Sequence, residues 1–266
     1  MLFSGRFSGK TAIVTGGASG IGEAFVRRFV AEGGQAMIAD LDSERAAALA
    51  QELGGGAAAE AIDVADAAAM PAVLDKAVAH FGPVHVLYNN AGIGNFGLTP
   101  DLDVEQWHRV IAVNLDAVFY ACKAVIPHMR ENGGGAIVNT ASASGMAADY
   151  GFTAYNAAKA GVINYTRCLA IDHARDGIRA NAICPGPVDT PLLTSGVDAI
   201  EGLRTTWEGV VPSGRFARPE EIASVALYLA SDDASGVTGA SIPVDGGLTA
   251  HTGQPDLRDV LGAPQP

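Results

Sequence analysis

The chain has 266 residues, of which 48% are hydrophobic and 17% charged, and this composition excludes a disordered chain. Acidic residues outnumber basic ones by 29 to 17, which gives a net charge of −12. A chain this acidic is a poor partner for nucleic-acid phosphates or for an anionic membrane surface, so neither partner is expected.

Signals for a membrane or for export are also missing from the sequence. No run of about 18 consecutive apolar residues is present, so no membrane span is expected. The first residues, MLFSGRFSGK, lack the apolar stretch of a secretory signal peptide. The cysteines Cys122, Cys168 and Cys184 have no C-x-x-C spacing, which indicates free thiols in a reducing compartment. We therefore predict a cytoplasmic protein.

Short apolar runs alternate along the chain with longer stretches of helical periodicity. The predicted strands are residues 11–15, 36–39, 57–62, 84–88, 136–140, 178–184 and 240–244. The predicted helices are residues 20–32, 43–53, 66–80, 104–130, 152–175 and 219–230. Strands joined by crossover helices form a parallel sheet that has helices on both faces. The sequence therefore predicts a doubly wound α/β fold of the Rossmann-like kind.

No fixed-period repeat and no Pro/Ser-rich linker divides the chain, so residues 1–266 are expected to form a single domain. Residues 10–183 are the predicted cofactor-binding and catalytic core. Residues 185–218 contain Pro, Gly and Trp207 without periodicity, which is typical of a lid over a substrate site. Residues 248–266 are polar and carry three prolines, so a disordered C-terminal tail is expected there.

The first predicted strand runs into a glycine-rich turn, T-G-G-A-S-G-I-G at residues 15–22, which opens a helix. The glycines let the backbone approach a pyrophosphate, and the helix N-terminus offers amide donors and the positive end of its dipole. A strand before the motif and a helix after it are the context that a dinucleotide site requires. Asp40 ends the second predicted strand, where a carboxylate would bind the adenine-ribose hydroxyls. A merely structural helix-cap role for Asp40 stays open.

Other motifs argue against competing chemistry. G-R-F-S-G-K-T at residues 5–11 resembles a phosphate loop, but it is one residue short between its glycines and precedes a strand instead of a helix. The six histidines form no H-E-x-x-H motif and no close Cys/His cluster, so no metal site is expected. The G-x-S-x-G turn of serine hydrolases is absent.

Tyr155 and Lys159 lie one turn apart on one face of a predicted helix. An ammonium beside a phenol favours the phenolate and lowers the phenol pKa from about 10, with each pKa unit worth about 1.36 kcal/mol. Such a tyrosine exchanges a proton near neutral pH. Ser142 follows the fifth predicted strand, at the edge where open α/β sheets bind ligands, and its hydroxyl can hold a carbonyl or alkoxide oxygen. The alternatives are an ordinary surface pair and a turn serine.

Together these motifs resemble the short-chain dehydrogenases/reductases. Between residues 10 and 247 the chain carries, in the family's order, T-G-G-A-S-G-I-G (15–22), D-V (63–64), N-N-A-G (89–92), V-N-L (113–115), Ser142, Y-N-A-A-K (155–159), P-G-P-V-D-T (185–190) and V-D-G-G (244–247). The resemblance implies a catalytic tetrad of Asn114, Ser142, Tyr155 and Lys159. In it Tyr155 is the general acid/base, Ser142 holds the substrate oxygen, Lys159 binds the nicotinamide ribose and Asn114 holds a water.

The resemblance also implies NAD as the cofactor. The implied cofactor-binding residues are Gly16, Ser19, Gly20, Ile21, Gly22, Asp40, Leu41, Asp63, Val64, Asn90, Ala91, Gly92, Tyr155, Lys159, Pro185, Gly186, Val188 and Thr190. The Asp40 carboxylate would repel a 2′-phosphate, which favours NAD over NADP. Ser19 and Leu41 stand where NADP-dependent members of the family often carry a basic residue.

The substrate pocket is expected to be mostly apolar and to take a small or medium uncharged alcohol or carbonyl. Its candidate residues are Phe96, Ser142, Ser144, Met146, Phe152, Tyr155, Pro187, Leu192, Leu193 and Trp207. None is Arg or Lys, so an anionic group would lack a bidentate partner, and nearby Asp149 would repel it. Arg204 reverses this expectation if the lid brings it over the pocket.

The predicted function is the interconversion of a secondary alcohol and a ketone by hydride transfer to or from NAD. One alternative is an NADPH-dependent 3-oxoacyl reductase of fatty-acid synthesis, against which Asp40 argues. The other is a non-catalytic cofactor-binding regulator, against which the intact tetrad argues.

The helices predicted at 104–130 and 152–175 carry apolar residues on more than one face, among them Val118, Phe119, Val162, Ile163 and Leu169. A helix that is apolar on two faces needs two partners, of which one would be the sheet and the other a symmetry mate. The family resemblance implies that the assembly is a homotetramer.

Overall fold

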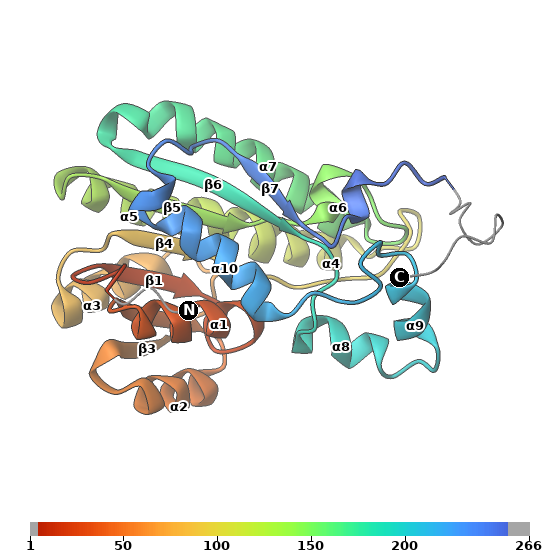
Figure 1. Ribbon diagram of the computed structural model, residues 1–266, viewed down its shortest axis with the longest axis horizontal. Helices are drawn as coiled ribbons and strands as arrows, with labels where there is room; N and C mark the ends of the chain where they lie inside the picture. Colours follow the sequence, from red (N-terminus) through yellow and green to blue (C-terminus); the bar gives the residue numbers. More distant parts are fainter. Residues whose placement is uncertain (1–4, 255–266) are drawn as a thin grey trace.

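Seven parallel strands form one sheet in the order β3-β2-β1-β4-β5-β6-β7 in the computed structural model, which describes residues 5–254 (Figure 1). The strands are β1 (Thr11–Thr15), β2 (Gln35–Asp40), β3 (Ala57–Ala61), β4 (Val86–Asn89), β5 (Gly135–Thr140), β6 (Ile178–Pro185) and β7 (Ser241–Val244). Each lies within two residues of a strand predicted from the sequence, because a strand buried on both faces reads as a short apolar run. The predicted doubly wound parallel sheet is confirmed.

The helices connect the strands on both faces of this sheet. They are α1 (Gly20–Ala31), α2 (Ser43–Leu53), α3 (Ala69–Phe81), α4 (Val104–Ile111), α5 (Ala117–Glu131), α6 (Ala143–Met146), α7 (Thr153–His173), α8 (Pro191–Val197), α9 (Leu203–Glu208) and α10 (Pro219–Ala230). Local chemistry sets several of the starts. The Asp42 side chain accepts from the Arg45 amide at 3.0 Å and caps α2. Pro219 occupies the first turn of α10, where its missing N–H is no loss.

Two hydrophobic cores lie on opposite faces of the sheet, because successive strand residues point to opposite sides. In β1, Ile13 joins the core covered by α3, α5 and α7, whereas Ala12 and Val14 join the core covered by α1, α2 and α10. The second core contains a stack of aromatic rings in which the Phe25 centroid lies 4.6 Å from that of Tyr88 and 5.5 Å from that of Phe29. Burial of large apolar side chains on both faces fixes the sheet between its helices.

We expect Phe25→Ala to lower the free energy of unfolding by about 3–5 kcal/mol, since it removes a fully buried ring that no neighbour replaces. Chemical denaturation at 25 °C measures the change. Val78→Ala on α3 is the matched control, because Val78 is exposed and its truncation should cost under about 1 kcal/mol. Equal losses in the two variants would contradict the assignment of Phe25 to the core.

The strand order reverses between β1 and β4, whose connections leave toward opposite sides of the sheet. In open α/β sheets such a switch point opens a crevice beyond the carboxyl ends of the strands, and ligands bind there. Helices α8 and α9 and the short α6 lie at this end of the sheet, to the right in Figure 1. The fold therefore places the glycine-rich turn, Asn90, Ser142 and the segment after β6 around one crevice.

The helix predicted over residues 104–130 is interrupted. A π-helical turn, Ala112–Asp116, separates α4 from α5, and periodicity alone does not report a one-residue change in helical winding. The stretch Val104–Glu131 is long and apolar enough to cross a membrane by composition, but half of its most apolar window is buried inside the fold. It is a core helix packed against the sheet.

The segment predicted as an irregular lid, residues 185–218, contains α8 and α9. Both helices are short, with seven and six residues, so their apolar pattern does not stand out from a loop. Of the predicted tail, Leu248–Ala250 forms a 3₁₀ turn held by Asp245, whose Oδ2 accepts from the Thr249 amide at 2.8 Å. Residues 255–266 lie outside the described residues.

Most of the apolar residues that were taken to mark a second helix face belong instead to the protein's own core. Val118, Val162, Ile163 and Leu169 are buried, and of the five only Phe119 is exposed. These four residues therefore belong to the face that packs against the sheet and do not mark a second apolar face, and a contact with a symmetry mate stays a prediction. Ile171 on α7, which is 79% exposed, is the apolar residue that joins Phe119 on the outer surface.

Candidate active site

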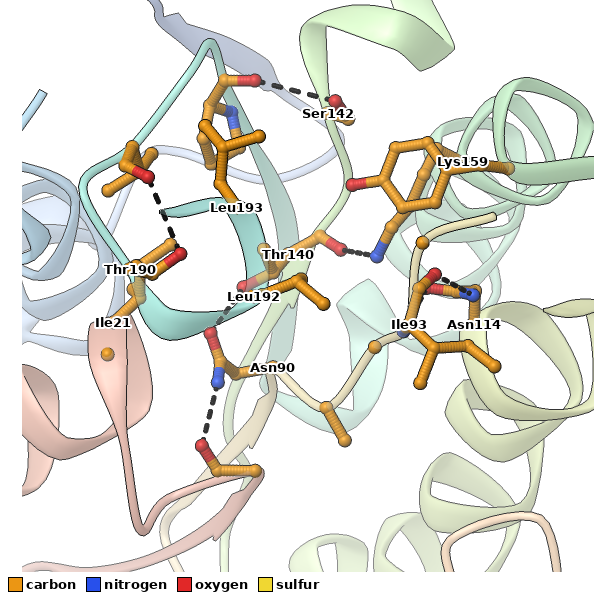
Figure 2. A pocket seen from close by; sticks show the side chains of 18 of the residues that line it. Ile21, Asn90, Ile93, Asn114, Thr140, Ser142, Lys159, Thr190, Leu192 and Leu193 are labelled. Atoms are coloured by element: carbon orange, nitrogen blue, oxygen red, sulfur yellow. Dashed lines mark hydrogen bonds between the residues drawn. The ribbon is translucent and has the colours of Figure 1, made fainter. Parts of the chain in front are cut away.

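A cavity of about 400 Å³ lies beyond the carboxyl ends of the strands and runs from the glycine-rich turn to the lid helices (Figure 2). Its wall includes nearly every residue proposed from the sequence for the cofactor, the catalytic tetrad and the substrate. Gly22, Phe96 and Met146 are the ones that do not line it. The structure thus brings together residues that are more than 180 positions apart in the chain, from Gly16 to Trp207.

The glycine-rich turn is built so that backbone, not side chains, forms the cavity wall. Gly16 has φ of 62°, and a Cβ atom there would lie 2.8 Å from the Ala91 Cα, so both the dihedral angle and the space require glycine. The Asn90 side chain donates to the Gly16 carbonyl at 3.0 Å and ties the turn to β4. Gly22 faces the turn itself: an added Cβ would lie 2.1 Å from the Gly16 oxygen. Its role is close packing of α1 against the turn.

Asp40 lines the cavity at the end of β2 and also organises the turn. Its Oδ2 accepts from the Ala18 amide at 2.9 Å and its Oδ1 from the Asp42 amide at 3.0 Å. Each carboxylate oxygen has a second lone pair, so these bonds leave acceptor capacity toward the cavity. Asp40 can therefore hold the backbone of the turn and still accept hydrogen bonds from the ribose hydroxyls of a cofactor.

Asp63, after β3, faces the same end of the cavity. A hydrogen bond from the Ala65 amide lowers the pKa of the Asp63 carboxyl, and Arg109 lowers it further. Arg109 lies 3.2 Å from Asp63 and lines the cavity, although no sequence motif marked it. This end of the site carries a balanced pair of charges.

Tyr155 and Lys159 come from the first turns of α7, and Ser142 follows β5 as predicted and caps the N-terminus of α6. The Lys159 Nζ donates to the Thr140 carbonyl at 2.8 Å (Figure 2). The same nitrogen lies 5.5 Å from the centroid of the Tyr155 ring. Tyr155 is hydrogen-bonded to Ser142. The general acid/base candidate, the oxygen-holding hydroxyl and the ammonium thus line the same cavity.

Burial sets the protonation of this pair. It lowers the pKa of the Lys159 ammonium to about 8, because the charged form is desolvated. Burial raises the pKa of the Tyr155 phenol above its ordinary value; the bond to Ser142 opposes this shift, and the Asp149 carboxylate adds to it. The expectation that Lys159 lowers the Tyr155 pKa is wrong for this structure, since the ammonium donates to a backbone carbonyl while burial dominates the phenol.

Asn114 lies in the π-helical turn between α4 and α5 and is fully buried. Its amide nitrogen donates to the carbonyl oxygens of Ile93 at 2.9 Å and Val110 at 3.0 Å, and its Oδ1 accepts from the Ile93 amide at 3.3 Å. A Cβ on Gly92 would lie 2.8 Å from that Oδ1 and 3.5 Å from the Lys159 Nζ. The π-helical turn thus holds the Asn114 side chain at the Ile93 backbone, in the wall of the cavity that also contains Lys159.

The lid contributes apolar side chains to the opposite wall, where Leu192, Leu193 and Trp207 line the cavity together with Phe152 and Pro187. Arg204 does not line it. The Arg204 guanidinium is engaged by Asp198 at 2.8 Å and Asp189 at 3.1 Å. Arg204 is therefore paired with carboxylates of the lid and is not placed to bind an anionic group of the substrate.

Two proposed substrate residues, Phe96 and Met146, lie outside the cavity wall and are exposed. Phe96 packs edge-on against Phe152 at 5.9 Å between ring centroids, so it supports a lining residue. Sequence reasoning missed Thr140, Ile93 and Leu248, which act through backbone groups or arrive from distant segments and so leave no motif.

Comparison with known proteins agrees with this geometry. A family model described as Enoyl-(Acyl carrier protein) reductase matches residues 16–249. The chain is 42% identical over 253 residues to meso-2,3-butanediol dehydrogenase from Serratia marcescens, with 95% of this chain and 99% of that protein covered. It is 40% identical over 253 residues to cyclohexanol dehydrogenase from Acinetobacter sp. (strain SE19), with 94% and 98% covered.

Among solved structures, levodione reductase matches with a TM-score of 0.87 and 36% sequence identity, over 92% of this chain and 99% of that one. The chain therefore belongs to the short-chain dehydrogenase/reductase family of oxidoreductases, which use a nicotinamide cofactor.

Proposed function

We propose that the protein interconverts a small, uncharged secondary alcohol and its ketone with NAD as cofactor. The observation that carries the proposal is the contact of Tyr155 with Ser142 and of Lys159 with Thr140, at the wall of a cavity that also contains the glycine-rich turn and Asp40. One cavity thus holds a proton-transfer group, an oxygen-holding hydroxyl and a dinucleotide cradle. A binding module has no need of the first two.

The lining residues fit a dinucleotide. Glycines at 16 and 92, where a Cβ would collide, let the backbone form the wall, and the N-terminus of α1 presents its amides there. Asp40 and Leu41 would hold the adenine ribose, Asp63 and Val64 the adenine, Asn90 and Ala91 the central part. Val188 and Thr190 would hold the carboxamide. When bound, the cofactor supplies the hydride acceptor or donor.

Proton transfer is assigned to residues of this chain. In alcohol oxidation the Tyr155 oxygen takes the hydroxyl proton while the Ser142 hydroxyl holds the substrate oxygen. Lys159, anchored on the Thr140 carbonyl, places a positive charge next to the phenol ring. Asn114 would hold a water that connects Lys159 to solvent. In ketone reduction the same groups act in reverse, with Tyr155 giving the proton.

The chemistry of the wall favours a neutral substrate. Apart from Lys159 and Arg109, no Arg or Lys lines the cavity in the described part of the chain, and Arg109 is paired with Asp63 at the adenine end. The relatives reported above are named for meso-2,3-butanediol, cyclohexanol and levodione, all uncharged. A panel of neutral alcohols with NAD and of ketones with NADH tests the proposal, with keto acids and acyl thioesters as competitors. If an anionic keto acid gave the highest kcat/KM of the panel, the proposal that the pocket prefers an uncharged substrate would be wrong.

The pH dependence of the two directions should differ in sign. Oxidation needs deprotonated Tyr155, whose pKa is raised by burial, so kcat/KM for oxidation is expected to rise about tenfold per pH unit from neutral into the alkaline range. Reduction needs the protonated phenol and should fall only at alkaline pH. Lys159, with a pKa of about 8, loses its charge in the same pH range. The apparent pKa values read from the two pH profiles therefore belong to the coupled Tyr155/Lys159 pair and not to one residue. A reduction rate that rises with pH would contradict the assignment.

We further propose a cytoplasmic homotetramer. Cys122, Cys168 and Cys184 are free in the structure, as suits a reducing compartment. Phe119 and Ile171 leave apolar surface exposed on α5 and α7, where a symmetry mate would cover it. Light scattering at micromolar concentration should give four times the chain mass. A monomer mass would contradict the tetramer, and Phe119→Glu should dissociate it.

A further inference from the structure

We infer that Asp149 and Ser144 form a recognition site for a second hydroxyl group on the substrate, next to the reacting carbon, so that the preferred substrates are vicinal diols and α-hydroxy ketones. The inference rests on the proposed alcohol/ketone function and narrows its substrate class. It arises from a polar corner of the cavity, to which the lid contributes apolar side chains, among them Leu192 and Trp207, and the hydroxyl of Thr190.

The corner is a chain of hydrogen bonds that leads away from the reacting atoms. The Ser142 and Ser144 hydroxyl oxygens lie 3.1 Å apart, and the Ser144 hydroxyl donates to the Asp149 carboxylate. Ser142, Ser144 and Asp149 all line the cavity. Because an ionised carboxylate only accepts, the Ser144 hydrogen is committed to Asp149. The Ser144 oxygen accepts from the Ser142 hydroxyl and keeps one further lone pair as an acceptor.

The spacing of the two serine oxygens suits two neighbouring oxygens on one substrate. In a vicinal diol or an α-hydroxy ketone the oxygens are three bonds apart, which is a separation comparable to the 3.1 Å between the hydroxyls. When Ser142 holds the reacting oxygen, the second hydroxyl lies opposite Ser144 and Asp149. It can donate to the carboxylate, as a ketone or ether at that position cannot.

The backbone of Asp149 is fixed by hydrogen bonds, and its exposed carboxylate accepts from Ser144. The Asn156 side chain donates to the Asp149 carbonyl at 2.9 Å and accepts from its amide at 3.4 Å, so the residue next to Tyr155 fixes the loop. Among residues 5–254 no ion pair engages the Asp149 carboxylate, whereas Asp189 and Asp198 in the lid both bind Arg204. An unneutralised carboxylate beside the catalytic serine attracts hydroxyl donors and repels anions.

The test compares 3,4-hexanediol with 3-hexanol, which share a carbon skeleton and differ in the second hydroxyl. In Asp149→Asn the ratio of kcat/KM for the diol to that for the mono-alcohol should fall about 10-fold to 100-fold, the loss typical of a hydrogen bond to a charged group. Ser144→Ala should lower the same ratio. The ratio removes any effect of Asp149 on Tyr155, because both substrates share that proton transfer. Asp75→Asn, an exposed residue of α3, is the matched control and should leave the ratio unchanged.

Binding supplies a second readout that needs no turnover. Trp207 lines the cavity, so tryptophan fluorescence in the presence of NAD follows titration with either alcohol, and Tyr155→Phe allows the titration without reaction. The diol should bind more tightly than the mono-alcohol, and adding Asp149→Asn should remove that difference.

The outcomes separate the two proposals. A ratio changed less than threefold by Asp149→Asn, with both alcohols oxidised in a Tyr155-dependent reaction, overturns the recognition site and leaves the proposed function standing. If neither alcohol is oxidised but the diol still binds through Asp149, the proposed function fails and the recognition site stands. The recognition site is overturned if the diol and the mono-alcohol bind equally to Tyr155→Phe and also bind equally to Tyr155→Phe/Asp149→Asn.

Discussion

Tyr155→Phe should lower kcat by about 100-fold to 10,000-fold, the usual loss when a general acid/base is removed. The substitution deletes one oxygen and keeps the ring that packs against Phe152 at 6.4 Å between centroids. Lys159 keeps its bond to the Thr140 carbonyl, so the cavity wall should stay in place. Steady-state kinetics with a neutral ketone and NADH measures the loss, and NADH fluorescence should still report binding.

The matched control is Tyr228→Phe, at an exposed residue of α10 that does not line the cavity. It removes the same hydroxyl from a residue that does not line the site and should keep kcat within about twofold. If Tyr155→Phe retained near wild-type kcat, Tyr155 would not be the proton-transfer group. The assignment of Ser142 and Lys159 as its partners in the reaction would then be wrong as well.

The second large effect concerns the choice of cofactor at Asp40. A 2′-phosphate beside this carboxylate would place like charges about 4 Å apart, a repulsion of about 4 kcal/mol at an effective dielectric of 20. Solvent screening at this partly exposed residue reduces that value, so we expect kcat/KM to favour NAD over NADP by about 100-fold to 1,000-fold. Initial rates with each cofactor at limiting concentration give the ratio.

Asp40→Asn is the informative variant, because the amide oxygen can still accept from the Ala18 backbone while the charge is gone. It should narrow the preference at least tenfold, and adding Leu41→Arg, at an exposed residue of the cavity wall, should favour NADP further. Asp42→Asn removes a charge two residues away, outside the lining, and should leave the ratio as it is. Wild-type kinetics that favoured NADP would refute the NAD proposal directly.

The local pattern of the sequence determined the sheet, its flanking helices and the position of the glycine-rich turn. A strand such as Thr11–Thr15 is buried on both faces and a helix such as α1 on one, and each leaves a short-range signature that needs no knowledge of the rest of the chain. The roles of Asn114, Tyr155 and Lys159 came from motifs in family order; without them Asn114 was only a polar residue in a helix.

Tertiary structure alone decided what depends on contacts between distant segments. Sequence periodicity could not show that a π-helical turn aims Asn114 at the Ile93 backbone, nor that Val162 and Leu169 face the protein's own core. It also could not show that Arg204 is bound by Asp189 and Asp198, or that Asp149 reaches Ser144. The protonation of Tyr155 was misjudged for the same reason: the i, i+4 spacing reports a neighbouring ammonium, but desolvation is set by everything that packs around the ring.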